Sequence, residues 1–331
     1  MKIGKISEPM LKRSVLKRIS YKDKTIFKGA GLSRDFASMN VKEDENIVMS
    51  TDTVIYGMDN IALYGVTKTV NNIATAGAVI KGIFVSVTMP SNTMESDINF
   101  LMREIASVCK EKKIEIIGGH SETVPYVTKM VVTFTGVGVR KKDCIIDISN
   151  IKPDMDIVMS KEIGIEGTAI LAYHRESELL KRFQRSFVEM TKRAVKDISV
   201  EKEAAIATAL NVSAMHDVSR GGIFGALWEM AASQSLGVEV NLEKIRVRQE
   251  TIEVCELLGL NPYTLVSGGA LLMITEDGES LKDELNKAGI QAEVIGKVTA
   301  SNDRVVIKGE ERRYLEPPKT DEINKLIEEK I

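Results

Sequence analysis

The first half of the chain alternates short β-branched apolar runs with longer segments of helical periodicity. Apolar runs occupy residues 47–50, 82–88, 114–117 and 130–139, and helical patterns occupy residues 61–78 and 95–112. Short runs rich in β-branched residues are typical of buried strands. The order strand, helix, strand, helix, strand predicts a mixed α/β (α+β) domain.

The second half predicts another α/β arrangement. We expect strands at 156–160, 271–275 and 291–295, helices at 168–173 and 224–234, a loop at 213–223, and one long amphipathic segment over 179–210. A final helix is expected after Pro318, with Asp321 as its N-cap. Because 331 residues are long for one hydrophobic core, we predict two domains, 1–150 and 151–331.

Composition and charge argue against nucleic-acid binding, a membrane span, a signal peptide and a disulfide framework. The 45 basic and 47 acidic side chains nearly balance, which gives no electrostatic reason to expect nucleic acid. There is no apolar run of roughly 18 residues that would span a membrane, and no apolar signal-peptide region near the start. The three cysteines are far apart and fit neither a disulfide framework nor a metal site. We expect a cytoplasmic protein.

Two segments near the N-terminus offer candidate ligands for a metal or phosphate. Asp52, in the segment 49–54, lies at or just past a predicted strand end, where its carboxylate would suit Mg²⁺; the alternative is a loop-capping role. The segment 29–37 contains Gly29, Gly31 and Asp35. Glycines let backbone amides approach phosphate, and Asp35 could bind the accompanying metal; the alternative is a plain turn.

The segment 116–125 is the most informative motif. An apolar strand runs into Gly118 and Gly119, followed by His120, Ser121 and Glu122. Paired glycines followed by polar groups are costly in a purely structural turn and are better explained by a ligand. His120 could act as an acid, a base or a ligand, although an isolated histidine is more often simply hydrogen-bonded.

Two loops in the second half lead into predicted helices. The amides of Gly167 and Thr168 could form an anion site at one helix start, or Thr168 could simply cap a tight loop. The segment 215–222 combines Asp217, Arg220 and two glycines, which would suit a phosphate or carboxylate. A structural Asp217–Arg220 pair is the competing interpretation.

The order of these motifs resembles the aminoimidazole ribonucleotide (AIR) synthase superfamily, which includes thiamine-monophosphate kinase, selenophosphate synthetase and the hydrogenase-maturation factor HypE. The resemblance runs from about residue 4 to 298. "STDTV" is similar to the strand-end Thr-Asp motif of that group, and "GVTKTVNNIATAGA" to a HypE helix written Gly-Thr-Val-Asn-Asp-Leu-Ala-Met-x-Gly-Ala. "IIGGHSETVP" resembles the Gly-Gly segment, and "MHDVSRGG" with the following residues resembles the HypE C-terminal domain.

This resemblance implies a two-domain PurM-like fold, with a C-terminal α/β sandwich and N-terminal domains that pair into a β-barrel across a homodimer. It implies ATP and Mg²⁺ as cofactors, with Asp35 and Asp52 at metal positions. Thr53, Asn71 and Asn72 would lie beside the nucleotide. The Gly118–Gly119 pair would approach its phosphates. The expected partners are a small-molecule acceptor and a maturation protein.

The chain departs from HypE in three places. Asn72 replaces an acidic residue, and His120 stands where HypE and the thiamine kinase carry Asp, so Mg²⁺ should be bound through fewer protein ligands. HypE ends in a cysteine that carries the group being dehydrated, whereas this sequence ends at Ile331 with none nearby. We therefore expect an ATP-dependent enzyme acting on a separate acceptor. The alternative is a nucleotide-binding or interaction protein that has lost turnover.

Overall fold

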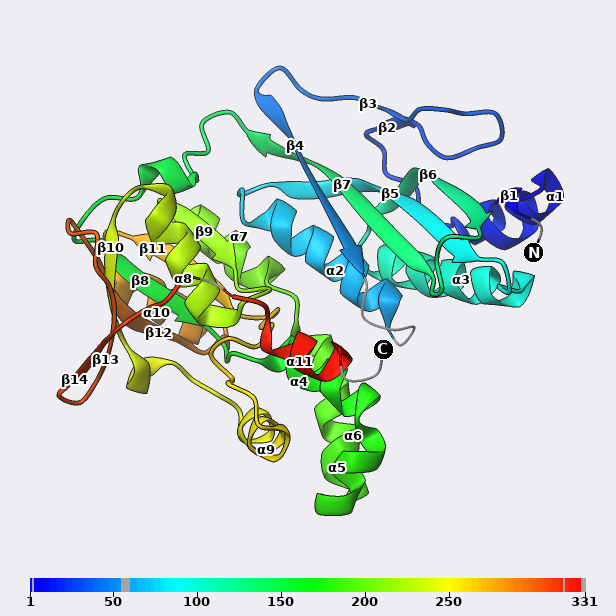
Figure 1. Cartoon of the computed structure of the whole chain (residues 1–331). Coiled ribbons are helices and arrows are strands. Elements are labelled where there is room, and N and C mark those ends of the chain that lie inside the picture. Colours follow the sequence, from blue (N-terminus) through cyan, green and yellow to red (C-terminus); the bar gives the residue numbers. More distant parts are fainter. Residues whose placement is uncertain (2, 55–59, 318, 329–331) are drawn as a thin grey trace. The chain divides into compact units, whose positions relative to one another are not determined.

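The chain forms two compact units, each with its own sheet and helices (Figure 1). The computed structural model describes residues 1, 3–54, 60–317 and 319–328. The first unit comprises Met1–Ala74 and Ala78–Asp143, and the second comprises Thr75–Gly77 and Cys144–Ile331. The mixed α/β class predicted from the sequence is confirmed.

The first unit contains a five-stranded sheet in the order β1-β6-β5-β7-β4. β5 pairs in parallel with β6 and antiparallel with β7, which in turn pairs antiparallel with β4. The strands of this sheet are β1 (Gly4–Lys5), β4 (Glu45–Val54), β5 (Val79–Pro90), β6 (Glu115–Val124) and β7 (Val131–Lys141). A separate ribbon pairs β2 (Ile26–Lys28) with β3 (Ser38–Met39).

Two helices, α2 (Ile61–Ala74) and α3 (Glu95–Glu111), pack on one face of this sheet (Figure 1). Phe134 of β7 is fully buried beneath α2. The helix approaches so closely that a Cβ on Gly65 would lie 2.0 Å from the Phe134 ring. A short N-terminal helix, α1 (Glu8–Met10), precedes a π-helical segment at Leu11–Val15 and a 3₁₀ turn at Leu16–Arg18.

The opposite face of the sheet presents apolar side chains to solvent. Ile47 and Met49 of β4 are 52% and 69% exposed, and Val79 of β5 is 62% exposed. The register aligns Ile47 with Val139 of β7, and Val139 with Val79, so these side chains lie in adjacent positions. The exposed side chains of Ile47, Met49 and Val79 therefore form an apolar patch of the kind that marks an interaction surface.

The second unit contains a seven-stranded sheet in the order β14-β13-β10-β12-β8-β11-β9. Most of its pairings are antiparallel, and β10 and β13 form a parallel pair. The strands are β8 (Asp156–Ser160), β9 (Ala214–Asp217), β10 (Gly237–Asn241), β11 (Leu271–Thr275), β12 (Ala292–Thr299), β13 (Arg304–Lys308) and β14 (Glu311–Tyr314). β9 lies where the sequence predicted a loop, so that part of the prediction is wrong.

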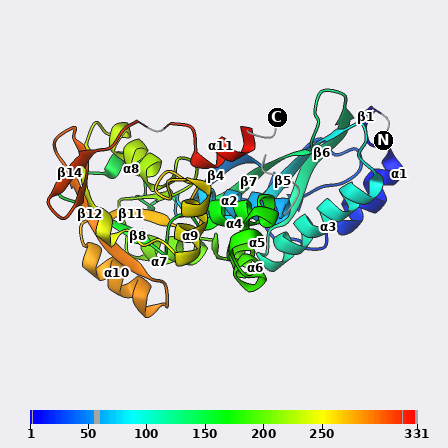
Figure 2. The same cartoon turned by 60° about the horizontal axis from the view of Figure 1, so that its bottom comes forward.

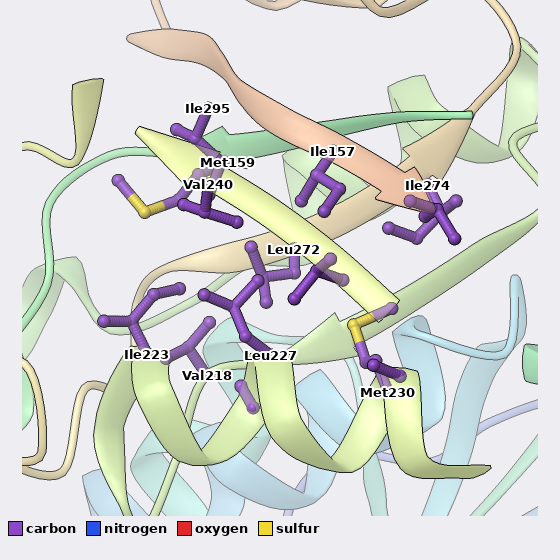
Figure 3. Close-up of a cluster of buried hydrophobic side chains, with 14 of the residues drawn as sticks. Ile157, Met159, Val218, Ile223, Leu227, Met230, Val240, Leu272, Ile274 and Ile295 are labelled. Atoms are coloured by element: carbon purple, nitrogen blue, oxygen red, sulfur yellow. The ribbon is translucent and has the colours of Figure 1, made fainter. Parts of the chain in front are cut away.

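Helices lie on both faces of this second sheet (Figure 2). On one face, Ile223, Leu227 and Met230 of α8 (Gly222–Ser233) pack against strand residues that include Ile157 and Leu272 (Figure 3). The other face is covered by α10 (Gly278–Lys287), which contacts β8 and β12. The part of the chain described contains no helix that is both long and apolar enough to cross a membrane.

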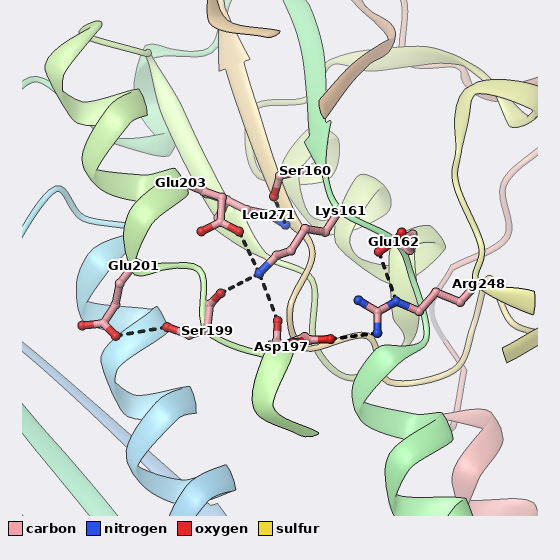
Figure 4. Close-up of polar contacts among 9 residues, drawn as sticks. All are labelled: Ser160, Lys161, Glu162, Asp197, Ser199, Glu201, Glu203, Arg248 and Leu271. Atoms are coloured by element: carbon pink, nitrogen blue, oxygen red, sulfur yellow. Dashed lines mark hydrogen bonds and ion pairs between the residues drawn. The ribbon is translucent and has the colours of Figure 1, made fainter. Parts of the chain in front are cut away.

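The amphipathic segment 179–210 is not one helix. It is divided among α5 (Glu176–Arg182), α6 (Arg185–Arg193), a 3₁₀ turn at Ala194–Asp197, and α7 (Glu201–Ala209). The first break occurs because Phe183 adopts an extended conformation, with ψ 154°. The second break, before α7, is stabilised by Lys161, which follows β8. Its ammonium donates to the carbonyl oxygens of Asp197 at 3.0 Å and Ser199 at 2.6 Å (Figure 4).

The remaining helices are α4 (Ile165–His174), α9 (Gln249–Leu258) and α11 (Glu322–Glu328). The Asp321 carboxylate accepts a hydrogen bond from the Ile323 amide at 3.0 Å at the start of α11. The predicted N-cap is therefore confirmed.

Candidate active site

The Gly118–Gly119 pair lies inside β6 and not in a turn beyond it. The strand continues through both glycines to Val124, and its register against β5 shifts between Ile83 and Phe84. The prediction that the strand ends at the glycines is therefore wrong. Gly119 has φ +150°, and a Cβ there would lie 1.9 Å from the Val85 carbonyl oxygen. Only glycine allows this close approach of two strands at the irregularity.

A pocket of about 430 Å³ opens beside these glycines, entirely within the first unit. It lies within the 300–1,000 Å³ range of ordinary small-molecule sites. Polar groups from β5, β6 and β7 meet apolar side chains from the N-terminal helical segment. The lining includes Lys5, Gly31, Arg34, Asp35, Gly118, Gly119 and His120, together with Phe84, Ser86, Thr133 and Thr135.

Two cationic side chains in this pocket were not identified from the sequence. Arg34 lies between the predicted Gly31 and Asp35, and its guanidinium donates to the Gly29 carbonyl at 3.1 Å. Lys5 of β1 lines the same pocket. The only sequence signal for Arg34 was its place inside the glycine-containing segment. A guanidinium and an ammonium in one pocket can neutralise phosphate oxygens.

His120 and Glu122 lie on the same face of β6, as expected for residues two apart on a strand. The His120 Nε2 atom is 3.6 Å from a Glu122 carboxylate oxygen, and both side chains are between a third and a half exposed. Only His120 is among the residues lining the pocket. The Glu122 carboxylate lies close enough to orient the His120 imidazole beside the pocket.

Gly29 lies over a buried carboxylate outside the pocket lining. A Cβ on Gly29 would lie 2.3 Å from Glu115 Oε1. The Glu115 side chain is 2% exposed, and it accepts a hydrogen bond from Lys22 Nζ at 2.7 Å and another from the Asp23 amide at 2.8 Å. The structure therefore gives Gly29 a packing role.

Asp52 lies within β4, two residues before the strand ends, and is not among the residues lining the pocket. One of its oxygens accepts from the Thr53 amide at 2.7 Å, and the other lies 3.8 Å from the Lys68 ammonium of α2. The Thr53 hydroxyl is 2.9 Å from that of Thr133. On α2, Asn71 is fully buried and Asn72 partly buried. The candidate residues of the first unit therefore fall into two groups. Gly31, Asp35, Gly118, Gly119 and His120 line the pocket, whereas Asp52 lies where β4 contacts α2.

The candidate metal ligands are the carboxylates of Asp35 and Asp52, whose expected metal is a Mg²⁺ ion bound to nucleotide phosphates. Among the residues the structure describes, no three His, Cys, Asp or Glu side chains cluster as a metal cage. Asp35 and Asp52 each supply a hard oxygen. Mg²⁺ in nucleotide sites is commonly held by one or two carboxylates together with phosphate oxygens and water. Asp35, which lines the pocket, therefore fits a nucleotide-borne Mg²⁺ better than a resident ion, whereas Asp52 lies outside the lining and faces Lys68.

In the second unit, the amides of Gly167 and Thr168 are already engaged. Gly167 N–H donates to the Val266 carbonyl at 3.0 Å, and Thr168 N–H donates to the Gly164 carbonyl at 2.9 Å. An anion could use these amides only if both hydrogen bonds broke, so the helix-start site predicted from the sequence is not present in this conformation. The Thr168 side chain itself is buried, with its hydroxyl 3.0 Å from that of Thr251.

The loop before α8 is occupied by a carboxylate from the chain itself. Asp217 is buried at the end of β9, while Arg220 is exposed. Asp321 accepts hydrogen bonds from the Gly221 amide at 2.7 Å and the Val266 amide at 3.2 Å. Burial raises the pKa of the Asp321 carboxyl, although these amides act in the opposite direction. The sequence predicted that this loop would bind a phosphate or carboxylate of a ligand, and in the structure a carboxylate of the chain itself accepts from the Gly221 amide.

Comparison with known families assigns both halves of the chain. Residues 33–140 match the model of the N-terminal domain of AIR synthase related proteins, and residues 152–308 match the model of their C-terminal domain. The chain belongs to the AIR synthase related family. The predicted superfamily and its PurM-like fold are confirmed.

Among curated relatives of this AIR synthase related chain is a hydrogenase expression/formation protein of Methanocaldococcus jannaschii. It is 27% identical over 92% of this chain and 91% of its own length. Carbamoyl dehydratase HypE of Cupriavidus necator is 25% identical over 80% of this chain and 76% of its own length.

Solved structures share the fold at lower sequence identity. HypE in complex with ATP superposes with a TM-score of 0.78 at 19% identity, covering 95% of each chain. Thiamine-monophosphate kinase of Stenotrophomonas maltophilia K279a gives a TM-score of 0.72 at 15% identity, covering 91% of this chain and 96% of its own. The HypE–HypF complex gives 0.69 at 21% identity, covering 82% of this chain and 91% of the other.

Proposed function

We propose that this chain is a HypE-like, ATP-dependent enzyme that binds MgATP in the pocket beside β6 and transfers a phosphoryl group to a separate acceptor. The observation that carries the proposal is the convergence of Gly118–Gly119, Arg34, Asp35 and His120 on one 430 Å³ pocket. HypE, which has the same fold, has been solved with ATP, and this supports a nucleotide as the ligand.

The residues of the pocket divide the work of phosphoryl transfer. Gly118 and Gly119 lack side chains, so a phosphate can approach the β6 backbone closely. Arg34 and Lys5 would neutralise phosphate oxygens, and Asp35 would hold Mg²⁺, which supplies charge neutralisation when bound. His120, oriented by Glu122, would accept a proton from the acceptor nucleophile.

The acceptor is proposed to be a separate molecule because the two buried thiols are poor nucleophiles. Burial raises the pKa of both Cys109 and Cys255 to about 12, so neither carries appreciable thiolate at neutral pH. Cys144 is partly exposed, but its thiol lies 3.8 Å from the Ala76 carbonyl in the second unit. A maturation protein that delivers the acceptor remains part of the proposal, since HypE has been solved with HypF.

Thermal melts with and without MgATP test the binding step. Ligand at about 100 times its dissociation constant should add about 2.7 kcal/mol of stability. Arg34→Gln and Asp35→Asn should abolish most of that shift, whereas the exposed Lys129→Gln control should keep it. If wild type shows no MgATP-dependent shift, the proposal fails.

A nucleotide-binding protein without turnover is the second candidate, and one contact favours it. The Lys68 ammonium already faces Asp52, and Asn72 adds no charge on the same helix, so less negative charge is available for Mg²⁺. ADP formation from ATP in the presence of an extract of small metabolites separates the two functions, because transfer leaves the phosphoryl group on the acceptor and releases ADP. A MgATP-dependent melting shift without ADP formation under any condition would favour the binding protein.

A further inference from the structure

A second pocket, of about 390 Å³, lies entirely within the second unit and has no part in the proposed ATP site. It is bounded by the starts of α4 and α9, by the end of α6 and by the 3₁₀ turn that follows. Its polar lining includes Thr168, Arg193, Lys196, Arg248, Glu250 and Thr251. We propose that this pocket binds a small organic anion whose phosphate or carboxylate group lies between Arg193, Lys196 and Thr251.

The charge in the pocket is arranged for an anion. Within the described part of the chain, neither Arg193 nor Lys196 forms an ion pair or a side-chain hydrogen bond. Arg248 is committed: it lies 3.2 Å from Glu162 and 2.9 Å from Asp197 (Figure 4). Two uncommitted cations therefore line the pocket together with two acidic side chains, Glu250 and Asp197, and Asp197 is already paired with Arg248. Glu250 could receive an amino or hydroxyl group of the same ligand.

The floor of the pocket supplies hydrogen-bond donors. Thr251 is 1% exposed, and its oxygen accepts a hydrogen bond from the Thr168 hydroxyl at 3.0 Å. This leaves the Thr251 hydroxyl proton available to donate into the pocket. The first amides of α9, from Gln249 to Thr251, have no intrahelical acceptor, and Arg248 provides no side-chain cap. Such a helix start attracts anions through its amides and its dipole.

The surrounding network holds the turn that carries Lys196, while the side chains of Arg193 and Lys196 are themselves exposed. Lys161, 18% exposed, pairs with the buried Glu203 at 2.7 Å and holds the turn through the Asp197 and Ser199 carbonyls (Figure 4). Arg248 ties the same turn to the start of α9. Buried charged groups cost free energy unless they are fully paired, and here they hold in place the turn that carries Lys196. The backbone that carries Lys196 is therefore already ordered before a ligand binds, which lowers the entropic cost of binding.

The test compares the full-length wild type with two pocket variants, and with Arg34→Gln in the first unit, in thermal melts and calorimetric titrations at constant ionic strength. Arg193→Gln/Lys196→Gln removes both cations, and Thr251→Val removes the buried hydroxyl while keeping the side-chain shape. The control is Lys202→Gln/Lys308→Gln, which makes the same change in net charge at two exposed positions. The probes are inorganic phosphate and acetate, with chloride as the reference.

Saturable binding of either probe to wild type and control, weakened about tenfold or more in both pocket variants, would support the proposal. The probe that binds identifies the phosphate or the carboxylate as the recognised group. Phosphate that binds in the first unit would be lost in Arg34→Gln and kept in the pocket variants, so that outcome counts against this pocket. Equal affinity in wild type and pocket variants, or no saturable binding of either probe, would overturn it. Melting without any probe checks that each variant is folded.

Discussion

Replacing Lys68 with methionine should have opposite effects on stability and on Mg²⁺ affinity. The Lys68 ammonium lies 3.8 Å from Asp52, and the two side chains are 8% and 22% exposed. At that distance and an effective dielectric constant of about 20, the Coulomb attraction is about 4 kcal/mol. Because solvent reaches Asp52, and methionine keeps the apolar stem of lysine, we expect a net loss of about 1–2 kcal/mol in the free energy of unfolding.

The same substitution removes a positive charge that competes with a metal ion for Asp52. If Asp52 is a Mg²⁺ ligand, Lys68→Met should bind MgATP about tenfold more tightly, which corresponds to about 1.4 kcal/mol. Asp52→Asn should instead lower both the stability and the affinity for MgATP. Stability should fall by about 2–4 kcal/mol, because the nearly buried Lys68 ammonium loses its carboxylate.

Urea unfolding measures the first effect, and titration of Mg²⁺ at fixed ATP measures the second. Lys129→Met, at an exposed position, controls for the loss of one positive charge. A Lys68→Met protein that loses stability but needs as much Mg²⁺ as wild type would refute Asp52 as a metal ligand. A variant that keeps full stability would show that the ion pair contributes nothing to folding.

Three further outcomes follow from the described residues. First, the exposed Ile47, Met49 and Val79 predict a homodimer through the open sheet face: light scattering should give twice the 36.5 kDa chain mass, and Met49→Asp should shift it toward the monomer. Second, a disulfide reagent should modify Cys144 first and reach Cys109 and Cys255 only after unfolding, because burial raises the pKa of both to about 12. Third, the Arg13 guanidinium, helped by Ser14, lowers the pKa of Glu95 from 4.5 to about 2. The stability that this contact contributes should be complete above the pKa of Glu95 in the unfolded chain, and it should be lost as the pH falls toward the pKa in the folded protein. In Glu95→Gln the free energy of unfolding should depend less on pH within that window.

The sequence by itself determined the fold class and most of the central elements. The β-branched runs at 47–50 and 82–88 lie inside β4 and β5, and the predicted strand 156–160 coincides with β8. These segments were readable because strand periodicity and burial act over a few neighbouring residues. The order of motifs also indicated the family, which the two domain models support.

The tertiary structure decided what local pattern could not. The segment 179–210 was predicted to be amphipathic, yet it breaks before Glu201, where Lys161, which follows the end of β8, donates to the carbonyl oxygens of Asp197 and Ser199. β6 runs through Gly118 and Gly119 because the neighbouring β5 backbone approaches there, a contact that no local sequence signal records.

The candidate site shows the same division. Sequence order placed Gly31, Asp35, Gly118 and His120 among the ligand-binding candidates, and the sheet brings them to one pocket. It also grouped Asp52 with them, but side chains on a strand alternate between faces, and Asp52 points to Lys68 of α2. Which face a residue occupies, and which distant charge it meets, depends on how the strands pair and how the helix packs. Both depend on contacts between residues far apart in the sequence, which form only in the folded chain.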